Sequence, residues 1–183
     1  MDRTEIRLAG NGGQGLILGA LILFRALGLE GRRAAQSQSY EPTSRGGFCY
    51  SDVIVTDDPS DYPLVTRLDT IVALAQVGLD RSIDLLKPGA LVIADERLVP
   101  TLPRGSFRLH ALPIGERAGE IGSSRIANII ALGVFARLSG LCSREALAEA
   151  VRQETPEKFA TLNLAAVDGG FALADTARMA AAS

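Results

Sequence analysis

Short apolar segments alternate with polar and glycine-rich segments over the first two thirds of the chain. Apolar runs of about four to eight residues bounded by turn residues are typical of buried strands. They predict strands at residues 5–9, 32–38, 48–56, 68–75, 90–96 and 107–112. Apolar positions that recur about every 3.6 residues are typical of helices with a buried face. They predict helices at residues 14–27, 78–86, 124–138, 143–151 and 156–177.

Individual residues mark several of the predicted helix boundaries. Pro88 and Gly89 are predicted to end the second helix, and Gly140 to end the third. Ser143 is the predicted N-cap of the fourth helix. The last helix is predicted to be interrupted at residues 169–170, which are both glycine.

Strands that alternate with helices indicate an α/β fold with a Rossmann-like, open and mostly parallel sheet and helices on both faces. From Ser123 onward the pattern is helical, so a helical C-terminal third is expected. A chain of 183 residues is long enough to bury a substantial core. We find no internal repeat and no low-complexity linker, and therefore expect residues 1–183 to form one domain.

Charge, apolar run length and cysteine content exclude several classes of protein. The formal net charge of -2 gives no general electrostatic reason to bind nucleic acid or an anionic membrane. The longest apolar run, residues 16–24, is far shorter than the roughly 20 residues that span a bilayer. Cys49 and Cys142 are too few to hold an iron–sulfur cluster or a structural zinc ion unaided. Because no signal peptide is recognisable, we expect a cytoplasmic protein with reduced thiols.

Gly10, Gly12 and Gly15 follow a predicted strand with the G-x-G-x-x-G spacing of a dinucleotide-binding turn. Glycines let the backbone approach a ligand closely, and the first amides of the next helix would face an anion held there. A nicotinamide site also needs an acidic residue roughly 20 residues further on, but residues 32–40 contain none. The turn is therefore a dinucleotide site, a tight turn without a ligand, or a turn that meets another ligand or chain. The polar Gln14 favours the last interpretation.

Two segments carry a resemblance to a known family. Residues 10–15, GNGGQG, resemble the G-x-G-G-Q-G turn of the gamma subunit, or gamma domain, of the 2-oxoacid:acceptor oxidoreductases. This family includes the pyruvate, 2-oxoglutarate, 2-oxoisovalerate and indolepyruvate enzymes. Residues 39–53, SYEPTSRGGFCYSDV, are similar to its S-Y-G-P-E-x-R-G-G segment, with these residues in place: Tyr40, Pro42, Arg45, Gly46 and Gly47.

The resemblance continues in order over nearly the whole chain. Residues 68–95, 120–141 and 157–174 are similar to later segments of the family. The residues that match its pattern there are Asn128, Gly133, Lys158, Asn163, Ala166 and Gly170. Glu41 and Thr43 depart from the family, which has Gly and Glu at these places. These departures leave the substrate class open without affecting the fold.

The resemblance implies an enzyme that oxidatively decarboxylates a 2-oxoacid, usually to an acyl-coenzyme A. It implies thiamine diphosphate, Mg²⁺ and iron–sulfur clusters on partner alpha, beta and ferredoxin-like delta subunits. This chain is not expected to hold a thiamine site itself, because its nearest match, VDGG at 167–170, leaves too few residues after it for the Asn that such a site needs. His110, the single histidine, is explained more readily as a surface or core residue than as a base. The isolated chain is therefore expected to be inactive and to complete the active site or coenzyme A site of its partners.

The two motifs supply the candidate ligand-binding residues: Gly10, Asn11, Gly12, Gly13, Gln14, Gly15, Tyr40, Arg45, Gly46 and Gly47. The planar guanidinium of Arg45 either holds a carboxylate or phosphate or ties the loop to its own carbonyls. The candidates for support are Glu41, Asn128 and Asn163. The two asparagines are interpreted as anchors of helices or loops more readily than as ligand contacts. No catalytic residue and no metal ligand is assigned.

Two other functions stay open, a stand-alone nucleotide-binding or regulatory module and a purely structural subunit that binds no ligand. The sequence also makes a prediction about association. Residues 16–24 are apolar on every side of the predicted helix, so other helices or a partner chain should cover them. We therefore expect a homodimer or a larger species when the chain is isolated.

Overall fold

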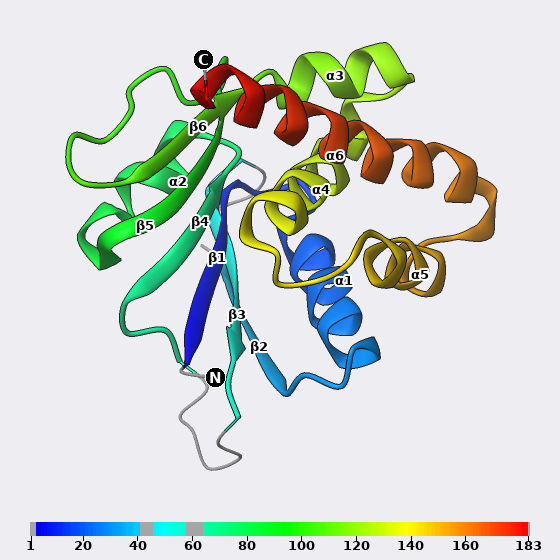
Figure 1. Cartoon of the computed structure of the whole chain (residues 1–183), viewed down its shortest axis with the longest axis horizontal. Helices are drawn as coiled ribbons and strands as arrows, with labels where there is room; N and C mark the ends of the chain where they lie inside the picture. The colour runs from blue at the N-terminus through cyan, green and yellow to red at the C-terminus, as the bar shows by residue number, and fades with distance from the viewer. Residues whose placement is uncertain (1–2, 41–45, 58–63, 183) are drawn as a thin grey trace.

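The computed structural model describes residues 3–40, 46–57 and 64–182, which contain a six-stranded sheet flanked by helices (Figure 1). The strands lie in the order β2-β3-β1-β4-β5-β6. Their bounds are β1 (Thr4–Asn11), β2 (Ala34–Tyr40), β3 (Phe48–Val55), β4 (Leu68–Ala73), β5 (Leu86–Asp95) and β6 (Arg108–Leu112). Five of them run in one direction, whereas β3 pairs antiparallel with both β1 and β2. The predicted open and mostly parallel sheet is confirmed.

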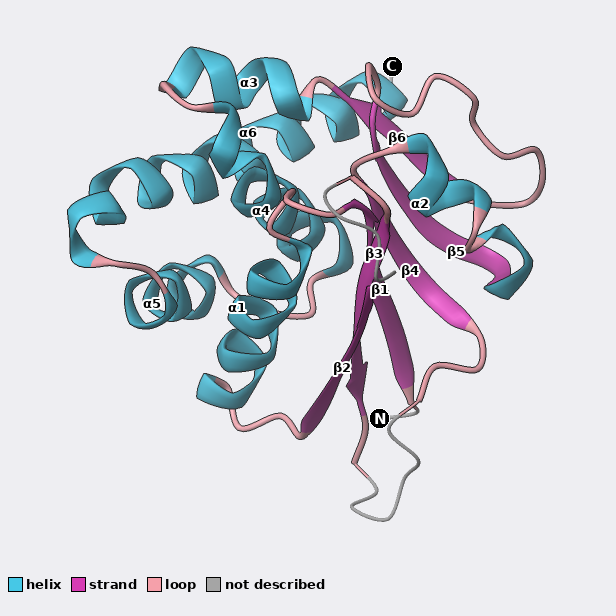
Figure 2. Cartoon of the chain, turned by 180° about the vertical axis from the view of Figure 1, so that it is seen from behind, coloured by secondary structure: helices cyan, strands magenta, loops and turns pink. Residues whose placement is uncertain are grey.

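Helices cover the two faces of the sheet unevenly (Figure 1, Figure 2). One side carries α1 (Leu16–Leu29), α3 (Ile114–Ile121), α4 (Ala127–Ser139), α5 (Arg144–Glu154) and α6 (Ala160–Ala182). The opposite side carries the short α2 (Gln76–Asp80). Alternate strand residues belong to two different cores, since Ile6 and Leu8 contribute to the core on the α1 side and Ala9 to the core with Leu79 of α2.

The helix predicted at residues 78–86 is wrong in its second half. Helix α2 ends at Asp80, and a 3₁₀ turn at Ile83–Leu85 connects it to β5. Pro88 and Gly89 therefore lie in a strand instead of ending a helix. The strand accommodates both residues because its pairing with β4 shifts register between Leu68 and Thr70. Gly89 there adopts a φ of +78°, which favours glycine.

The helical region also differs from the prediction at two places. It begins earlier, with α3 at Ile114, where Gly115 and Gly119 weaken the helical pattern. The last helix, α6, continues through residues 169–170 without the predicted interruption. These glycines serve packing, because a Cβ on the second of them would lie 2.8 Å from the Cα of Gly133 in α4.

Two boundary predictions around α5 are confirmed. Gly140 ends α4 with a φ of 66°, and the Ser143 hydroxyl accepts a hydrogen bond from the Ala146 amide at 3.1 Å. The α5 helix packs along α1 and covers much of its outer surface, leaving Leu18 and Leu29 partly exposed. Helices of the same chain therefore cover most of the apolar α1. The homodimer stays a prediction without support from this helix, and light scattering at micromolar concentration tests it.

Glu5, near the start of β1, ties the segment before β4 to the sheet. Its buried carboxylate accepts hydrogen bonds from the amides of Thr66 at 2.6 Å and Arg67 at 2.9 Å. The Nε atom of Arg3 donates a further hydrogen bond at 2.7 Å. Burial raises the pKa of Glu5, but these hydrogen bonds outweigh burial and hold the pKa below its ordinary value of 4.5.

We expect Glu5→Gln to lower the free energy of unfolding at neutral pH by about 2 kcal/mol, because one charged acceptor serves several donors. Since the pKa is lowered in the folded state, the stabilisation is complete above pH 4.5. It is lost as the pH falls through the lower folded pKa. Urea denaturation of both proteins at neutral and at acidic pH checks this prediction. A stability difference that does not shrink in acid would contradict it.

Candidate functional site

The glycine turn, residues 10–15, connects β1 to α1 at the carboxyl edge of the parallel strands. The strands β1 and β4 are neighbours in the sheet, and the helices that follow them cover opposite faces (Figure 2). After β1 the chain enters α1 on one face, and after β4 it enters α2 on the other. The turn therefore lies at a topological switch point, where open α/β sheets bind their ligands.

The side chain of Gln14 holds the turn in shape. Its Oε1 atom accepts a hydrogen bond from the Asn11 amide at 2.6 Å, and its Nε2 atom donates to the Leu74 carbonyl at 2.7 Å. Gly10 leaves room for this arrangement, because a Cβ there would overlap Gln14 Oε1. Both ends of the Gln14 amide are therefore bonded within the chain, and Gln14 acts on a ligand through the backbone that it positions.

The N-terminus of α1 has the backbone chemistry that suits an anion. Gly15 is its N-cap with a φ of 71°, and no side chain of the described residues caps the helix. The first amides of a helix have no acceptor within the helix, and the dipole places positive charge there. Gly13 has a φ of 96°, and no atom of the described residues lies within 4 Å of its Cβ position. A ligand can therefore reach the backbone of this turn closely.

The second predicted motif meets the turn directly. The Gly12 amide donates a hydrogen bond to the Gly47 carbonyl at 2.9 Å. The Cβ position of Gly12 also lies 3.7 Å from the Gly46 amide nitrogen. The structure thus brings together the two glycine motifs that are 35 residues apart from Gly12 to Gly47. Tyr40 ends β2, while its side chain and the remaining predicted residues of this motif, Glu41, Pro42, Thr43 and Arg45, lie outside the described residues.

Of the two predicted supporting asparagines, only Asn128 is at the turn. Its Nδ2 atom donates to the Gly15 carbonyl at 3.0 Å, so the start of α4 is tied to the start of α1. Its Oδ1 atom is buried and has no hydrogen-bond partner among the described residues. Asn163 instead donates to Thr155 Oγ1 at 3.0 Å and anchors α6 to the end of α5.

The sheet order does not favour the dinucleotide interpretation. In a nicotinamide-binding fold, the second strand lies beside the first and supplies the acidic residue that binds the ribose. Here β3 lies between β1 and β2, which moves the end of β2 to roughly 10 Å from β1. The described strand Ala34–Tyr40 also carries no acidic residue. Both the position and the chemistry of the ribose contact are therefore missing.

Gly78 is a residue of the site that sequence analysis missed. It lies in α2, and a Cβ there would be 2.6 Å from both the carbonyl carbon of Ala9 and the amide nitrogen of Gly10. Helix α2 therefore rests on the backbone of β1 where the turn begins. A glycine within a predicted helix was the available signal, because such a residue often marks close backbone packing.

A buried ion pair joins β1, which ends at the glycine turn, to β3, which begins after Gly46 and Gly47. Arg7 of β1 contacts Asp52 of β3 through Nε–Oδ1 at 2.7 Å and Nη2–Oδ2 at 2.9 Å. The guanidinium carbon lies 4.0 Å from the centre of the Tyr50 ring. Burial raises the pKa of Asp52, and the Arg7 charge offsets this rise in part. The charged residues within apolar strands were the sequence signal for this pair.

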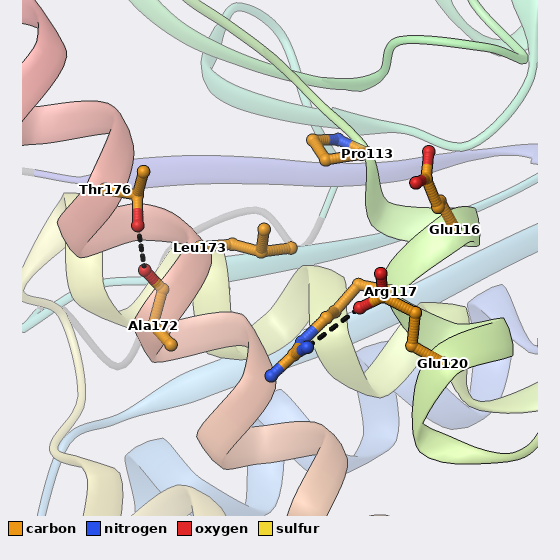
Figure 3. Close-up of a pocket in the computed structure, with 7 residues that line it drawn as sticks. All are labelled: Pro113, Glu116, Arg117, Glu120, Ala172, Leu173 and Thr176. Carbon is orange, nitrogen blue, oxygen red and sulfur yellow. Dashed lines mark hydrogen bonds and ion pairs between the residues drawn. The ribbon is translucent and has the colours of Figure 1, made fainter.

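The cysteines and the cavities add no catalytic group to the turn. Burial raises the pKa of the Cys49 thiol, and it raises that of Cys142 to about 12. Among the described residues, no three acidic, histidine or cysteine side chains gather as a metal site requires. A cavity of about 330 Å³ between α3 and α6 contains the Arg117–Glu120 ion pair and no residue of the turn (Figure 3). No helix of the described chain is long and apolar enough to cross a membrane.

Residues 5–173 match the family model of pyruvate ferredoxin/flavodoxin oxidoreductase. The chain is 39% identical over 176 residues to the 2-oxoglutarate synthase subunit KorC of Methanocaldococcus jannaschii, covering 94% of both chains. It is also 39% identical to the crystal structure of the keto/oxoacid ferredoxin oxidoreductase gamma subunit from Geobacter sulfurreducens. The TM-score is 0.85, and the match covers 94% of this chain and 99% of that one.

A longer enzyme shares the fold at lower identity. The 2-oxoglutarate:ferredoxin oxidoreductase from Magnetococcus marinus matches with a TM-score of 0.85 at 24% identity, over 96% of this chain and 32% of that chain. The chain belongs to the pyruvate ferredoxin/flavodoxin oxidoreductase family, as its motifs implied. It is a gamma-type subunit of a 2-oxoacid oxidoreductase, an enzyme that acts on the oxo group of its donor.

Proposed function

We propose that this gamma subunit completes the coenzyme A site of a thiamine-diphosphate-dependent 2-oxoacid:acceptor oxidoreductase. The observation that carries the proposal is the N-terminus of α1, which no side chain of the described residues caps and which follows the glycine turn directly. The phosphates of coenzyme A are anions that suit this position. We assign thiamine diphosphate, Mg²⁺ and the iron–sulfur clusters to alpha, beta and delta partners. This chain has two cysteines and one histidine, which are too few to hold an iron–sulfur cluster.

The turn has the shape and charge that an anionic group requires. Gly13 offers backbone without a side chain, and the helix dipole is worth on the order of 1 kcal/mol to an anion at this end. The buried Oδ1 atom of Asn128 has no hydrogen-bond partner among the described residues, and it can accept from a hydroxyl or amide donor of the ligand but not from its phosphates. We propose that the guanidinium group of Arg45 binds a phosphate or carboxylate through two parallel hydrogen bonds. We propose that Tyr40 and Glu41 shape the loop around Arg45.

We propose 2-oxoglutarate as the first oxoacid to test, because the Methanocaldococcus relative is a 2-oxoglutarate synthase subunit. The Magnetococcus enzyme binds 2-oxoglutarate, coenzyme A and succinyl-CoA. The chain should be purified alone and together with its alpha and beta partners. Oxoacid-dependent dye reduction is expected from the assembly, and the same activity in the isolated chain would contradict the proposal.

Gly13→Asp and Gly13→Asn form a matched pair that tests the anion site. Both add a side chain of the same shape at a φ of 96°, where none of the described residues lies within 4 Å of the new Cβ. Only the aspartate repels a phosphate. We expect Gly13→Asp to raise the KM for coenzyme A at least about tenfold over Gly13→Asn in the assembled enzyme, which corresponds to about 1.4 kcal/mol. Equal KM values for the two variants would show that no anion binds at the turn.

The same assays separate the two alternative functions. A nucleotide-binding or regulatory module would bind NAD, NADP or FAD with micromolar affinity in calorimetry of the isolated chain. A purely structural subunit would leave every Michaelis constant unchanged in Gly13→Asp and in Arg45→Ala. Our proposal expects coenzyme A to bind in preference to the nicotinamide nucleotides, and the KM for coenzyme A to rise in both variants.

A further inference from the structure

A second cavity lies at the opposite end of α4 from the glycine turn. It has a volume of about 430 Å³ and is lined mainly by residues of β6 and of the C-terminal parts of α4 and α6. Asn128, the second residue of α4, contacts the turn, whereas Gly140 after its last residue lines the cavity. A helix of 13 residues is roughly 20 Å long, so the cavity and the turn are separate places.

The cavity is lined by basic side chains from three elements: Arg108 and His110 of β6, Arg137 of α4 and Arg178 of α6. Arg137 forms an ion pair with Asp175, with Nε and Oδ1 2.6 Å apart. Arg108 and Arg178 have no ion pair among the described residues. The lining therefore carries three guanidinium groups, of which Arg137 alone has a carboxylate partner among the described residues, on a chain whose formal net charge is -2.

The other charged groups around the cavity leave it positive. The carbonyl end of α4 at Gly140 contributes about half a negative charge, which is less than the charge of Arg108 and Arg178 together. Arg108 also lines an adjoining cavity. The charges of Lys87 and Asp69 in that cavity offset each other, because the two form an ion pair at 2.7 Å. Burial and the charge of Arg108 both lower the pKa of His110, in keeping with a positive local potential.

We propose that this cavity binds a small anion with two or more negative charges, such as a diphosphate. Its volume lies in the range of small-molecule sites, about 300–1,000 Å³. Arginine forks on two different elements can each hold one charged group of such a ligand. The site consists of residues of this chain, so the proposal does not depend on the coenzyme A site at the turn.

His110 reports on this site without ambiguity, because the chain has one histidine. The full chain should be titrated with pyrophosphate and, separately, with citrate, while the imidazole resonances are followed by NMR. Sodium chloride at matched ionic strength is the reference. We expect a saturable shift of the His110 resonances and a higher pKa of His110 in the complex, because a bound anion favours the imidazolium.

Matched variants locate the binding. Changing Arg108 and Arg178 together to serine should weaken binding at least tenfold, whereas Arg104→Ser, at an exposed arginine outside the cavity, should leave it unchanged. Gly13→Asp should also leave the His110 titration unchanged, which separates this site from the turn. Saturation by citrate and not by pyrophosphate would assign the site to polycarboxylates. The proposal is overturned if neither anion shifts His110 beyond sodium chloride, or if the double variant binds as the wild type does.

Discussion

Replacing Gly78 with alanine is expected to lower coenzyme A-dependent turnover of the assembled enzyme by about a hundredfold. The new Cβ would lie 2.6 Å from backbone atoms of Ala9 and Gly10, and backbone cannot move aside as a side chain can. Helix α2 and the end of β1 must therefore separate by about an ångström. The glycine turn begins at Gly10, so it would move with the end of β1. A displacement of this size at a binding site can lower the rate by about two orders of magnitude.

The matched control is Gly119→Ala in α3, another glycine in a helix but with nothing within 4 Å of its Cβ position. It should keep wild-type turnover and gain slightly in stability, because alanine favours a helix. Steady-state kinetics with varied coenzyme A measures both variants, and circular dichroism verifies that each is folded. If Gly78→Ala is folded and turns over as fast as Gly119→Ala, α2 does not position the turn.

Replacing Gly170 with alanine is expected to lower the free energy of unfolding by about 3 kcal/mol. The new Cβ would overlap the Ile130 carbonyl oxygen and would lie 2.9 Å from the amide nitrogen of Val134. The two helices must then move apart over buried surface, and overpacking of this kind costs about 1–3 kcal/mol or more. This loss exceeds the roughly 1 kcal/mol that alanine gains over glycine in a helix.

Gly169→Ala is the matched control, one position earlier in the same helix. Its Cβ would lie 2.7 Å from the Cδ1 atom of Ile121, the end of a flexible side chain that can change rotamer. We expect its free energy of unfolding to stay within about 1 kcal/mol of the wild type. Urea denaturation measures both variants. Equal losses for the two would indicate that the close contact between α4 and α6 is not what requires Gly170.

The positions of the strands were predictable because their signal is local. A buried strand such as β5 requires a run of apolar residues whatever lies beside it. The direction of β3 was not predictable, since parallel and antiparallel strands share this pattern. The insertion of β3 between β1 and β2 depends on pairings such as Arg7 with Asp52, 45 residues apart. This insertion is what separates the site from a nicotinamide-binding fold.

The candidate site likewise combines local features that were predictable from the sequence with tertiary contacts that were not. The glycines of the turn and the Gly46–Gly47 segment were found from sequence because their conformations depend on short motifs. The roles of the side chains were not, because they depend on what lies opposite each one. Gln14 was expected to favour a turn that meets a ligand or another chain, and the structure adds that both ends of its amide are bonded to backbone of the same chain.

The sequence by itself determined the family, the order of most elements and the two glycine motifs, since each of these depends on residues close together in the chain. Only the tertiary structure decided which distant residues support them. It packs Gly78 against the backbone of β1, bonds Asn128 to the Gly15 carbonyl before α1, and brings Arg108 and Arg178 to the lining of one cavity. These contacts join residues tens of positions apart, and their geometry depends on how helices and strands pack, which local patterns do not encode.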